Sequence, residues 1–411
     1  MGNFSIALSG LQADSVALNT IGNNLANLNT TAFKGQTTAF EDLFYQQIGQ
    51  SGSGDAIQLG AGTRVSGTST NFTEGTILPD SNANSADMAL AGNGFFVVQQ
   101  GGVQSLTRAG NFQLSSSGNL ITQDGQQVMG YAAVNGVVNQ NSSLSPITIP
   151  VGLNEGAQAT QNFSVTTNLN SNATVGTSFS TPVQIFDSLG QSHQATVSYT
   201  KTATNTWSYS VALPAGDATG VPTNNTGTLT FDTSGNLVSP TGSVNNITFP
   251  TLADGASDLS FNWNLNNSTG TPTISQLAAA SSNTANSQDG FTSGVYQSFV
   301  VDSTGVITAQ FSNGRTSTIG QLAVATVANT AGLTASGGNN FNTTAASGLA
   351  TVGVAGAGGR GTLDDGALEQ SNVNISTEFS NLIVAQRAFE ANSKTVTTFD
   401  TISQDVLSMV R

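Results

Sequence analysis

Residues 371–411 read SNVNISTEFSNLIVAQRAFEANSKTVTTFDTISQDVLSMVR and contain neither glycine nor proline. Apolar residues recur in this segment at intervals of seven, or of three and four, which places them on one face of a helix. The apolar stripe consists of Ile375, Phe379, Leu382, Phe389, Val396, Phe399, Ile402, Val406 and Val410. Asn374 is a predicted N-cap, and Glu378 complements the helix dipole in the first turn. The pattern predicts a long amphipathic helix at the carboxyl end.

Residues 1–30 show the same kind of pattern. Their stripe consists of Phe4, Leu8, Leu11, Leu18, Ile21, Leu25 and Leu28. Gly22 weakens this helix by about 1 kcal/mol, and the run Asn27–Thr31 favours a stop. Each of the two helices has a single apolar face that needs a partner. The candidates are the core of its own domain, the other terminal helix, or the same helix in a neighbouring copy.

Between the two ends the hydrophobic period changes to two, which is typical of β-strands. Trp207, Tyr209 and Val211 alternate with polar residues and are predicted to form a hairpin with the strand that precedes them. Four short segments that end in Ser-Gly, Leu-Gly or Thr-Gly separate such runs. Such segments can also be calcium-binding loops, but their spacing differs from that of an EF-hand loop and favours hairpin turns.

The sequence therefore predicts a mainly β chain with α-helical termini, in which coiled-coil-like helices from both ends pair and two β domains are nested. Eight of the nine prolines lie between Pro146 and Pro272, which sets an inner segment apart. The predicted parts are a terminal helical domain (1–30 and 371–411), extended connecting segments (31–71 and 363–370), an outer β domain (72–146 and 289–362) and an inserted inner β domain (147–288).

Composition excludes several classes of function. Only 8% of the residues are charged, where about 25% is typical, and the net charge is −14. The nine Lys and Arg residues are scattered singly, so nucleic acid and anionic membranes are poor partners. No run of residues is apolar enough to insert into a membrane. The absence of cysteine excludes disulfides and thiolate metal sites.

Catalytic chemistry has few candidates. His193 is the only histidine, and Asp187 lies near it in the sequence. A Ser-His-Asp hydrolase would use this histidine as its base, but no Gly-x-Ser-x-Gly elbow accompanies it. A zinc site with one histidine and no cysteine would need carboxylates as its other ligands. The sequence therefore predicts no catalytic residue, no metal site and no cofactor.

The amino-terminal motif comprises ALSGL at 7–11, LNTIGNNLAN at 18–27 and NTTAFK at 29–34. Together with GALEQSNV at 366–373 and VAQRAFEAN at 384–392, it closely resembles the terminal signatures of the flagellar rod and hook proteins. The motif residues in the first segment are Gly10, Asn23, Asn24, Ala26, Asn27, Asn29, Thr30, Phe33 and Lys34. Ala32 stands where the family usually has glycine, so the local bend is expected to differ if that glycine serves a special backbone angle.

This resemblance implies an axial structural protein that polymerises with copies of itself outside the bacterial cell. The size of the inner β domain favours the hook member of the family over the distal rod member. The implied partners are the distal rod protein, the hook cap protein, the hook–filament junction protein, and the flagellar type III export apparatus with its chaperones. Export would proceed without a cleaved signal peptide, because no basic residue precedes Lys34.

Three alternatives stay open at this point. A distal rod-type axial protein would lack the large inner insertion. A secreted hydrolase would need a pocket assembled around His193. A β-rich adhesin would also be rich in Thr and Asn, but it would not need paired helical ends.

Overall fold

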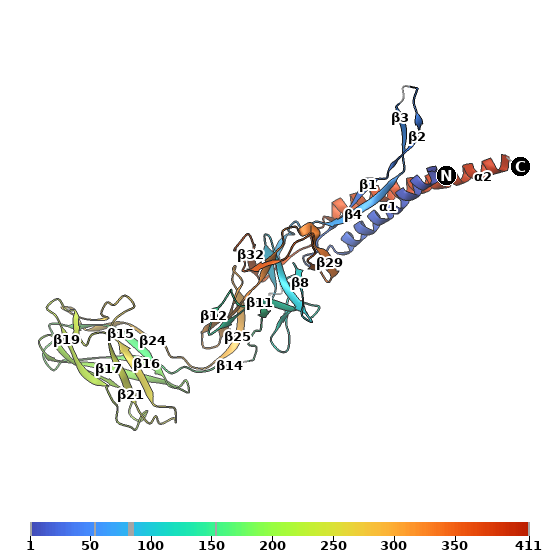
Figure 1. Cartoon of the computed structure of the whole chain (residues 1–411). Coiled ribbons are helices and arrows are strands. Elements are labelled where there is room, and N and C mark those ends of the chain that lie inside the picture. Colours follow the sequence, from blue (N-terminus) through green and yellow to red (C-terminus); the bar gives the residue numbers. More distant parts are fainter. Residues whose placement is uncertain (1, 53–54, 81–85, 153, 410–411) are drawn as a thin grey trace. The chain divides into compact units, whose positions relative to one another are not determined.

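Helices at the two ends of the chain lie side by side in the computed structural model, which describes residues 2–52, 55–80, 86–152 and 154–409 (Figure 1). Helix α1 spans Gly2–Ala26 and helix α2 spans Ile375–Met409. The predicted cap of α2 is confirmed, because the side chain of Asn374 accepts hydrogen bonds from the backbone amides of Ser376 and Thr377 at 3.0 and 3.1 Å. The predicted fold class, mainly β with helical termini, is also confirmed.

The chain divides into two compact units. The first comprises residues 1–151, 298–309 and 316–411, and the second comprises 152–297 and 310–315. The second unit thus extends past the predicted end of the inner domain at 288. The finer division into helical, connecting, outer and inner parts remains a prediction.

Helices α1 and α2 are antiparallel and meet through short side chains. Gly10 and Asp14 of α1 lie beside Asn392 of α2, whose Nδ2 donates to Asp14 Oδ2 at 2.8 Å. At the other end of the pair, Asn24 Nδ2 donates to Glu378 Oε1 at 3.3 Å. The described residues of α1 that are buried are Ala7, Gly10, Ala13, Ala17, Thr20 and Asn24. Small residues let the two backbones approach closely, so the contact does not use the leucines of the predicted stripe as its centre.

The segment after α1, predicted only as an extended connection, forms two antiparallel strand pairs. Its strands are β1 (Gln36–Asp42), β2 (Tyr45–Gln50), β3 (Ala56–Gly60) and β4 (Thr63–Thr70). Strand β1 pairs with β4, and β2 with β3. The first pair contacts α1, where Thr38 Oγ1 donates to Thr20 Oγ1 at 3.0 Å.

Short strand pairs then join the outgoing chain to the returning chain. These are β5 (Ile77–Pro79) with β33 (Ala367–Glu369), and β6 (Met88–Ala91) with β32 (Thr362–Asp365). They place the segment that leads into α2 next to the segment that follows α1.

The rest of the first unit is a sheet with the strand order β27-β11-β7-β8-β30-β29. The strands of this sheet and the short strands attached to it are β7 (Phe95–Gln100), β8 (Val103–Thr107), β9 (Gln113–Leu114), β10 (Leu120–Ile121), β11 (Gln127–Val134), β12 (Val137–Val138), β13 (Ser145–Pro146), β27 (Thr316–Leu322), β28 (Val324–Thr326), β29 (Thr334–Gly337), β30 (Asn340–Asn342) and β31 (Thr351–Gly353). A single 3-10 turn spans Thr330–Gly332. The sheet buries an apolar core that includes Phe95, Leu106 and Phe341.

The remaining strands include two that cross the division between the units. Strand β14 (Asn154–Glu155) pairs with β25 (Gly294–Val301), which pairs with β26 (Val306–Phe311). The division falls inside β25 and β26. The turn Asp302–Gly305 joins these two strands, as predicted, and Asp302 Oδ1 accepts from the amides of Thr304 and Val306.

Two five-stranded sheets form the second unit. Their strands are β15 (Asn162–Asn170), β16 (Ser178–Phe186), β17 (Ser192–Ala203), β18 (Thr206–Ala212), β19 (Thr226–Phe231), β20 (Leu237–Ser239), β21 (Ser243–Phe249), β22 (Leu259–Asn264), β23 (Ile274–Leu277) and β24 (Ser282–Gln288). The predicted hairpin is confirmed, with Tyr199 of β17 opposite Tyr209 of β18. Both sheets contribute to one apolar core, which contains both tryptophans of the chain, Trp207 and Trp263.

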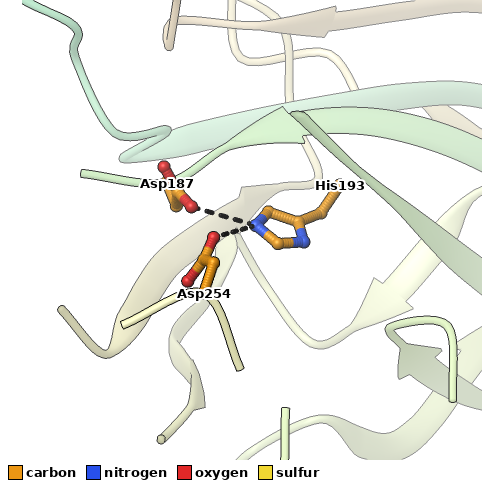
Figure 2. Close-up of side chains that lie close together, drawn as sticks. All are labelled: Asp187, His193 and Asp254. Atoms are coloured by element: carbon orange, nitrogen blue, oxygen red, sulfur yellow. Dashed lines mark hydrogen bonds and ion pairs between the residues drawn. The ribbon is translucent and has the colours of Figure 1, made fainter. Parts of the chain in front are cut away.

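One polar cluster lies beside this core. His193 on β17 is surrounded by carboxylates, two of which reach the same ring nitrogen in Figure 2. Its Nε2 lies 3.1 Å from Asp187 Oδ2, and its Nδ1 lies 2.9 Å from Asp217 Oδ2. These carboxylates hold the pKa of His193 above its ordinary value, although burial acts in the opposite direction and is the largest single influence.

We predict that Gly10→Leu disrupts the helix pair and that Gly22→Leu does not. A Cβ at Gly10 would lie 2.7 Å from Asn392 Nδ2, whereas a Cβ at Gly22 has no neighbouring atom within 4 Å. Overpacking at position 10 should cost about 1–3 kcal/mol, while Gly22→Leu should add a few tenths of a kcal/mol or more through helix propensity. Urea unfolding followed by far-ultraviolet circular dichroism measures both, and equal midpoints for the two variants would contradict the packing described.

Candidate assembly surface and its buried polar junction

The predicted apolar stripe of α1 lies at the edge of the helix pair and on its outside. Leu8 is 43% exposed. The half-buried members of the stripe are Leu11, Leu18, Ile21, Leu25 and Leu28. The side chain of Phe4 lies outside the described part of the structure. Large apolar side chains on α1 therefore remain accessible after the helix has packed in its own chain.

The stripe of α2 is more exposed still. Its exposed members are Ile375, Phe379, Phe389, Ile402 and Val406, and its half-buried members are Leu382, Val396 and Phe399. Val410 lies outside the described residues. Among the described residues of α2 only Ala385 is buried. A helix of 35 residues thus leaves most of its apolar surface without a partner inside the chain.

Other exposed apolar residues on the two helices lie outside the predicted stripes. They are Val16, Ile383, Val384, Leu407 and Met409. Ile383 and Val384 directly follow Leu382, so they widen the apolar surface around the helix. The sequence contains the run Leu382, Ile383 and Val384, but the seven-residue interval assigns only Leu382 to the stripe.

A groove of about 450 Å³ lies between the helix pair and strand β1. Ala17 and Ile21 of α1, Val384 and Ala388 of α2, and Phe40 of β1 contribute its apolar walls. The groove and the exposed stripes form the candidate assembly surface. No helix in the described part of the chain combines the length and hydrophobicity needed to cross a membrane.

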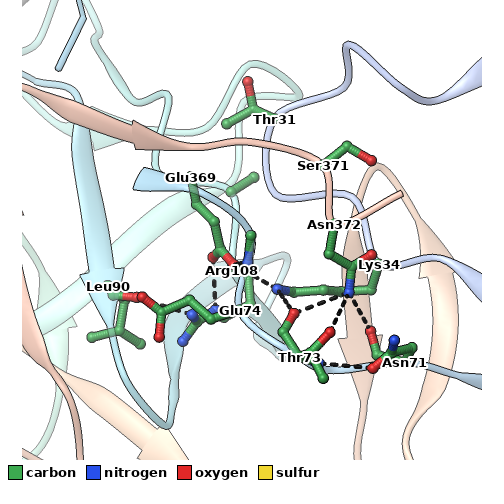
Figure 3. Close-up of polar contacts among 12 residues, drawn as sticks. Thr31, Lys34, Asn71, Thr73, Glu74, Leu90, Arg108, Glu369, Ser371 and Asn372 are labelled. Carbon is green, nitrogen blue, oxygen red and sulfur yellow. Dashed lines mark hydrogen bonds and ion pairs between the residues drawn. The ribbon is translucent and has the colours of Figure 1, made fainter. Parts of the chain in front are cut away.

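A buried polar junction joins the segment that follows α1 to the segment that precedes α2 (Figure 3). Lys34 from the amino-terminal motif binds Glu369 from the carboxyl-terminal motif, with Nζ 2.5 Å from Oε1. Arg108 Nε binds the other carboxylate oxygen of Glu369 at 3.0 Å. The Glu369 side chain is completely buried, and those of Lys34 and Arg108 are nearly so. One carboxylate therefore joins two cations that lie far apart in the sequence.

Backbone groups complete the hydrogen bonding of this junction. Lys34 Nζ also donates to the carbonyl oxygen of Thr73 at 2.9 Å, and Glu369 Oε1 accepts from the amide of Gly75 at 2.8 Å. The guanidinium of Arg108 donates to three carbonyl oxygens, of Leu90, Gly92 and Gly94. Buried charges are tolerated only when they are paired and hydrogen-bonded in this way. Burial lowers the pKa of Lys34, and its hydrogen bond with Glu369 opposes that shift.

Two asparagines extend the junction toward the helices. Asn24, in α1, accepts from the amide of Gln36 at 2.9 Å and donates to the carbonyl oxygen of the same residue at 2.7 Å. Asn372, just before α2, accepts from the amide of Gly35 at 2.8 Å and donates to the carbonyl oxygen of Asn71 at 2.8 Å (Figure 3). The side-chain amides of both asparagines bind the segment that follows α1, so they fix the direction of this segment relative to α2.

The other motif residues shape the turn after α1. Asn27 Nδ2 donates to the carbonyl oxygen of Asn23, and Thr30 Oγ1 donates to Asn27 Oδ1. The carbonyl oxygen of Phe33 accepts from the amide of Asn372 at 3.2 Å. Ala26 and Asn29 are exposed.

Ala32 has a left-handed backbone conformation. Its φ is +54° and its side chain is buried. A positive φ is where glycine is favoured, which accounts for the glycine usual at this position. Alanine takes this left-handed conformation here, and the expectation that the local bend differs from that of the family stays a prediction.

We predict that Glu369→Gln strongly destabilises the first unit, because it leaves Lys34 and Arg108 buried without an anion. The expected loss is about 3–5 kcal/mol. Lys34→Met should cost less, since Glu369 keeps its pair with Arg108. The control is Glu41→Gln, which removes the exposed pair with Arg64 and should cost less than about 1 kcal/mol.

The unfolding of the two units can be followed separately in this experiment. Both helices lie in the first unit and both tryptophans in the second. Glu369→Gln should lower the urea midpoint seen by circular dichroism and leave the midpoint seen by tryptophan fluorescence unchanged. A circular dichroism midpoint equal to that of Glu41→Gln would show that the junction contributes no more than a surface ion pair.

Comparison with known proteins gives matches along most of the chain. Family models match in four places: "Flagella basal body rod protein" at residues 4–34, "Flagellar hook protein FlgE/F/G D1 domain" at 89–168, "Flagellar basal body protein FlaE D2 domain" at 165–291 and "Flagellar basal body rod FlgEFG protein C-terminal" at 364–409. Most of both helices, the three charged residues of the junction (Lys34, Arg108 and Glu369) and most of the second unit fall within these matches.

Relatives that match over nearly the whole length of both chains show the family to which the chain belongs. The flagellar hook protein FlgE of Salmonella typhimurium is 35% identical, over 99% of this chain and 100% of the relative. That of Treponema pallidum is 32% identical, over 98% of each. The crystal structure of Helicobacter pylori flagellar hook protein FlgE2 has the same fold over 71% of this chain and 100% of that one, with a TM-score of 0.55 and 16% identity. The chain therefore belongs to the flagellar hook protein FlgE family.

Proposed function

We propose that this hook subunit polymerises through the outward apolar faces of α1 and α2, which pack against the same helices of neighbouring copies. The protein is a structural subunit of the hook, which is the flexible joint that transmits torque from the basal-body rod to the filament. The observation that carries the proposal is that the residues buried in the two helices are mainly small, whereas large apolar residues of both helices remain exposed or half-buried. Contiguous exposed apolar surface on a folded protein marks an interaction site.

The end of α2 contributes several exposed apolar side chains to this surface. Helix α1 has 25 residues and α2 has 35, and Asn392 already lies opposite Gly10. The last turns of α2 therefore continue beyond the start of α1, as Figure 1 shows. Ile402, Val406, Leu407 and Met409 are all at least half exposed there. Contacts between different patches on successive copies repeat without closing and generate a helical tube.

The environment of His193 supports a structural role and not an enzymatic one. A Ser-His-Asp hydrolase needs a serine hydroxyl within reach of its catalytic histidine. In the described structure, the hydrogen bonds and ion pairs of the His193 ring all go to carboxylates. The family is structural, and we infer that this chain is not an enzyme.

Membership of the family also suggests the other partners and the location. We infer contacts with the distal rod protein, the hook cap protein and the hook–filament junction protein at the ends of the polymer. The subunit would leave the cell through the flagellar type III apparatus with its chaperones, without a cleaved signal peptide. The acidic charge, −14, argues against nucleic acid as a partner.

Bending is assigned to the second unit. Only 8% of the residues of the whole chain are charged, and few of these charged residues lie in the second unit. Within its described residues every ion pair involves His193. Water-mediated contacts between such surfaces exchange easily, so neighbouring second units can slide while the packed helices carry the torque.

We predict that Ile402→Ser combined with Val406→Ser raises the critical concentration for polymerisation. Burial of each side chain is worth about 1.5–3 kcal/mol, and 1.4 kcal/mol is a factor of ten, so an increase of at least about tenfold is expected. Sedimentation of polymer from concentrated protein measures it. Gln404→Ser, an exposed polar position between the two, is the control and should behave as the wild type. An unchanged critical concentration in the double variant would contradict the proposal.

A second prediction concerns curvature. Strands β14 and β25 bring Glu155 opposite Gly294, so residues 156–293 can be replaced by an Asn-Gly turn, which suits a two-residue hairpin. We expect this variant to polymerise with an unchanged critical concentration and to give tubes of altered curvature and stiffness. Electron micrographs measure both properties. Tubes that bend like those of the wild type would remove the sliding role from the second unit.

A further inference from the structure

We propose that the second unit contains a binding site for a divalent transition-metal ion, of which Zn²⁺ is the best fit, at Asp187, His193 and Asp254. The three residues come from different parts of the sandwich. Asp187 follows β16, His193 lies on β17, and Asp254 lies in the loop between β21 and β22. The proposal is independent of polymerisation, because the two helices belong to the other unit.

The two distances from His193 Nε2 to the carboxylates are close to those between ligand atoms around a tetrahedral ion. His193 Nε2 lies 3.1 Å from Asp187 Oδ2 and 3.6 Å from Asp254 Oδ2. One ligand atom from each of the three residues lies within 4.8 Å of the other two. Zinc–nitrogen and zinc–oxygen bonds of about 2.0–2.2 Å place tetrahedral ligands about 3.3–3.6 Å apart. Figure 2 shows both carboxylates directed at the same nitrogen, so small movements would suffice to share an ion.

Backbone amides aim the two carboxylates. Asp187 Oδ1 accepts from the amides of Leu189 and Gln191 at 2.8 and 2.9 Å. Asp254 Oδ1 accepts from the amide of Ala256 at 3.0 Å. In each case one oxygen is occupied by the loop, and Oδ2 is the oxygen that faces the imidazole. The ligand geometry is therefore set before any ion binds.

Asp217 supplies the outer partner that a metal-binding histidine ordinarily has. Its Oδ2 lies 2.9 Å from His193 Nδ1, the ring nitrogen that the other two aspartates do not contact. A carboxylate in this position fixes the ring and the tautomer that leaves Nε2 free to bind a metal.

The charge of the cluster also favours a cation. Three carboxylates surround one imidazole, and the Asp187 side chain is completely buried. In the described structure no lysine or arginine pairs with any of them. Even a protonated His193 would balance only one of the three charges, and buried carboxylates need compensation. Asp217 and Asp254 are about 30% exposed, which gives an ion access from solvent.

The donor set selects the class of metal. Imidazole nitrogen with carboxylate oxygen suits Zn²⁺ and Co²⁺. Ca²⁺ prefers six to eight oxygen ligands, which this cluster does not offer. Bound here, the ion would tie the loops after β16 and β21 to strand β17 and stabilise the second unit. Three protein ligands and one water molecule would together give the ion four ligands in a tetrahedral arrangement.

The test is a titration of the chelator-treated full-length protein with CoCl₂ and ZnCl₂. We expect one Co²⁺ per chain with the intense visible absorption of tetrahedral cobalt, and displacement of that signal by Zn²⁺. Zinc should raise the thermal midpoint followed by tryptophan fluorescence by several degrees and leave the midpoint of the helices unchanged. Absence of the cobalt absorption together with an unchanged fluorescence midpoint would overturn the proposal and leave His193 as an imidazolium among carboxylates.

Matched variants locate the ion. Asp254→Asn lies in a partly exposed loop, so the unit should fold, and it should weaken cobalt binding at least tenfold. His193→Gln should abolish the tetrahedral absorption. Asp232→Asn is the control, since Asp232 makes the same turn as Asp187 but has no histidine beside it, and it should bind as the wild type does. Cobalt binding that survives Asp254→Asn undiminished would place the ion elsewhere and overturn the assignment.

Discussion

The buried carboxylate of Glu369 is the constraint on which the first unit depends. It holds Lys34, from the start of the chain, and Arg108, from the sheet, and all three side chains are completely or almost completely buried. Since unpaired buried charges are costly, the two ends of the chain must meet in one register. That register sets α1 beside α2 with Gly10 against Asn392, and the short side chains between them leave the large apolar ones outside.

Local patterns were sufficient to predict the helices, the cap at Asn374 and the hairpin of Tyr199 and Tyr209, because each depends on residues close together in the sequence. The side on which each helix meets its partner was not predictable in this way. Intervals of seven identify the most apolar stripe, whereas the contact uses alanine and glycine, whose weak hydrophobicity gives little signal. The ion pair of Lys34 with Glu369 and the approach of Asp254 to His193 bring together distant positions, and no spacing rule covers them.

The two units divide the work of a flexible polymer. In the first, a network of buried charges and a close helix contact give rigidity and expose apolar surface. In the second, the apolar core is enclosed between two sheets, and the surface is polar with few charges. We propose that strong contacts between the helices of neighbouring copies and weak contacts between their second units allow the tube to transmit torque while it bends.

Solvent access to the end of α2 tests the central claim most directly. The chain has no cysteine, so Ile402→Cys and, as a control on the same helix, Arg387→Cys each provide one thiol, whose rate of reaction with a maleimide can be measured in monomer and polymer. The account predicts that the thiol at 402 reacts readily in the monomer and becomes strongly protected in the polymer. A thiol at 402 that reacts equally fast in both states would contradict it.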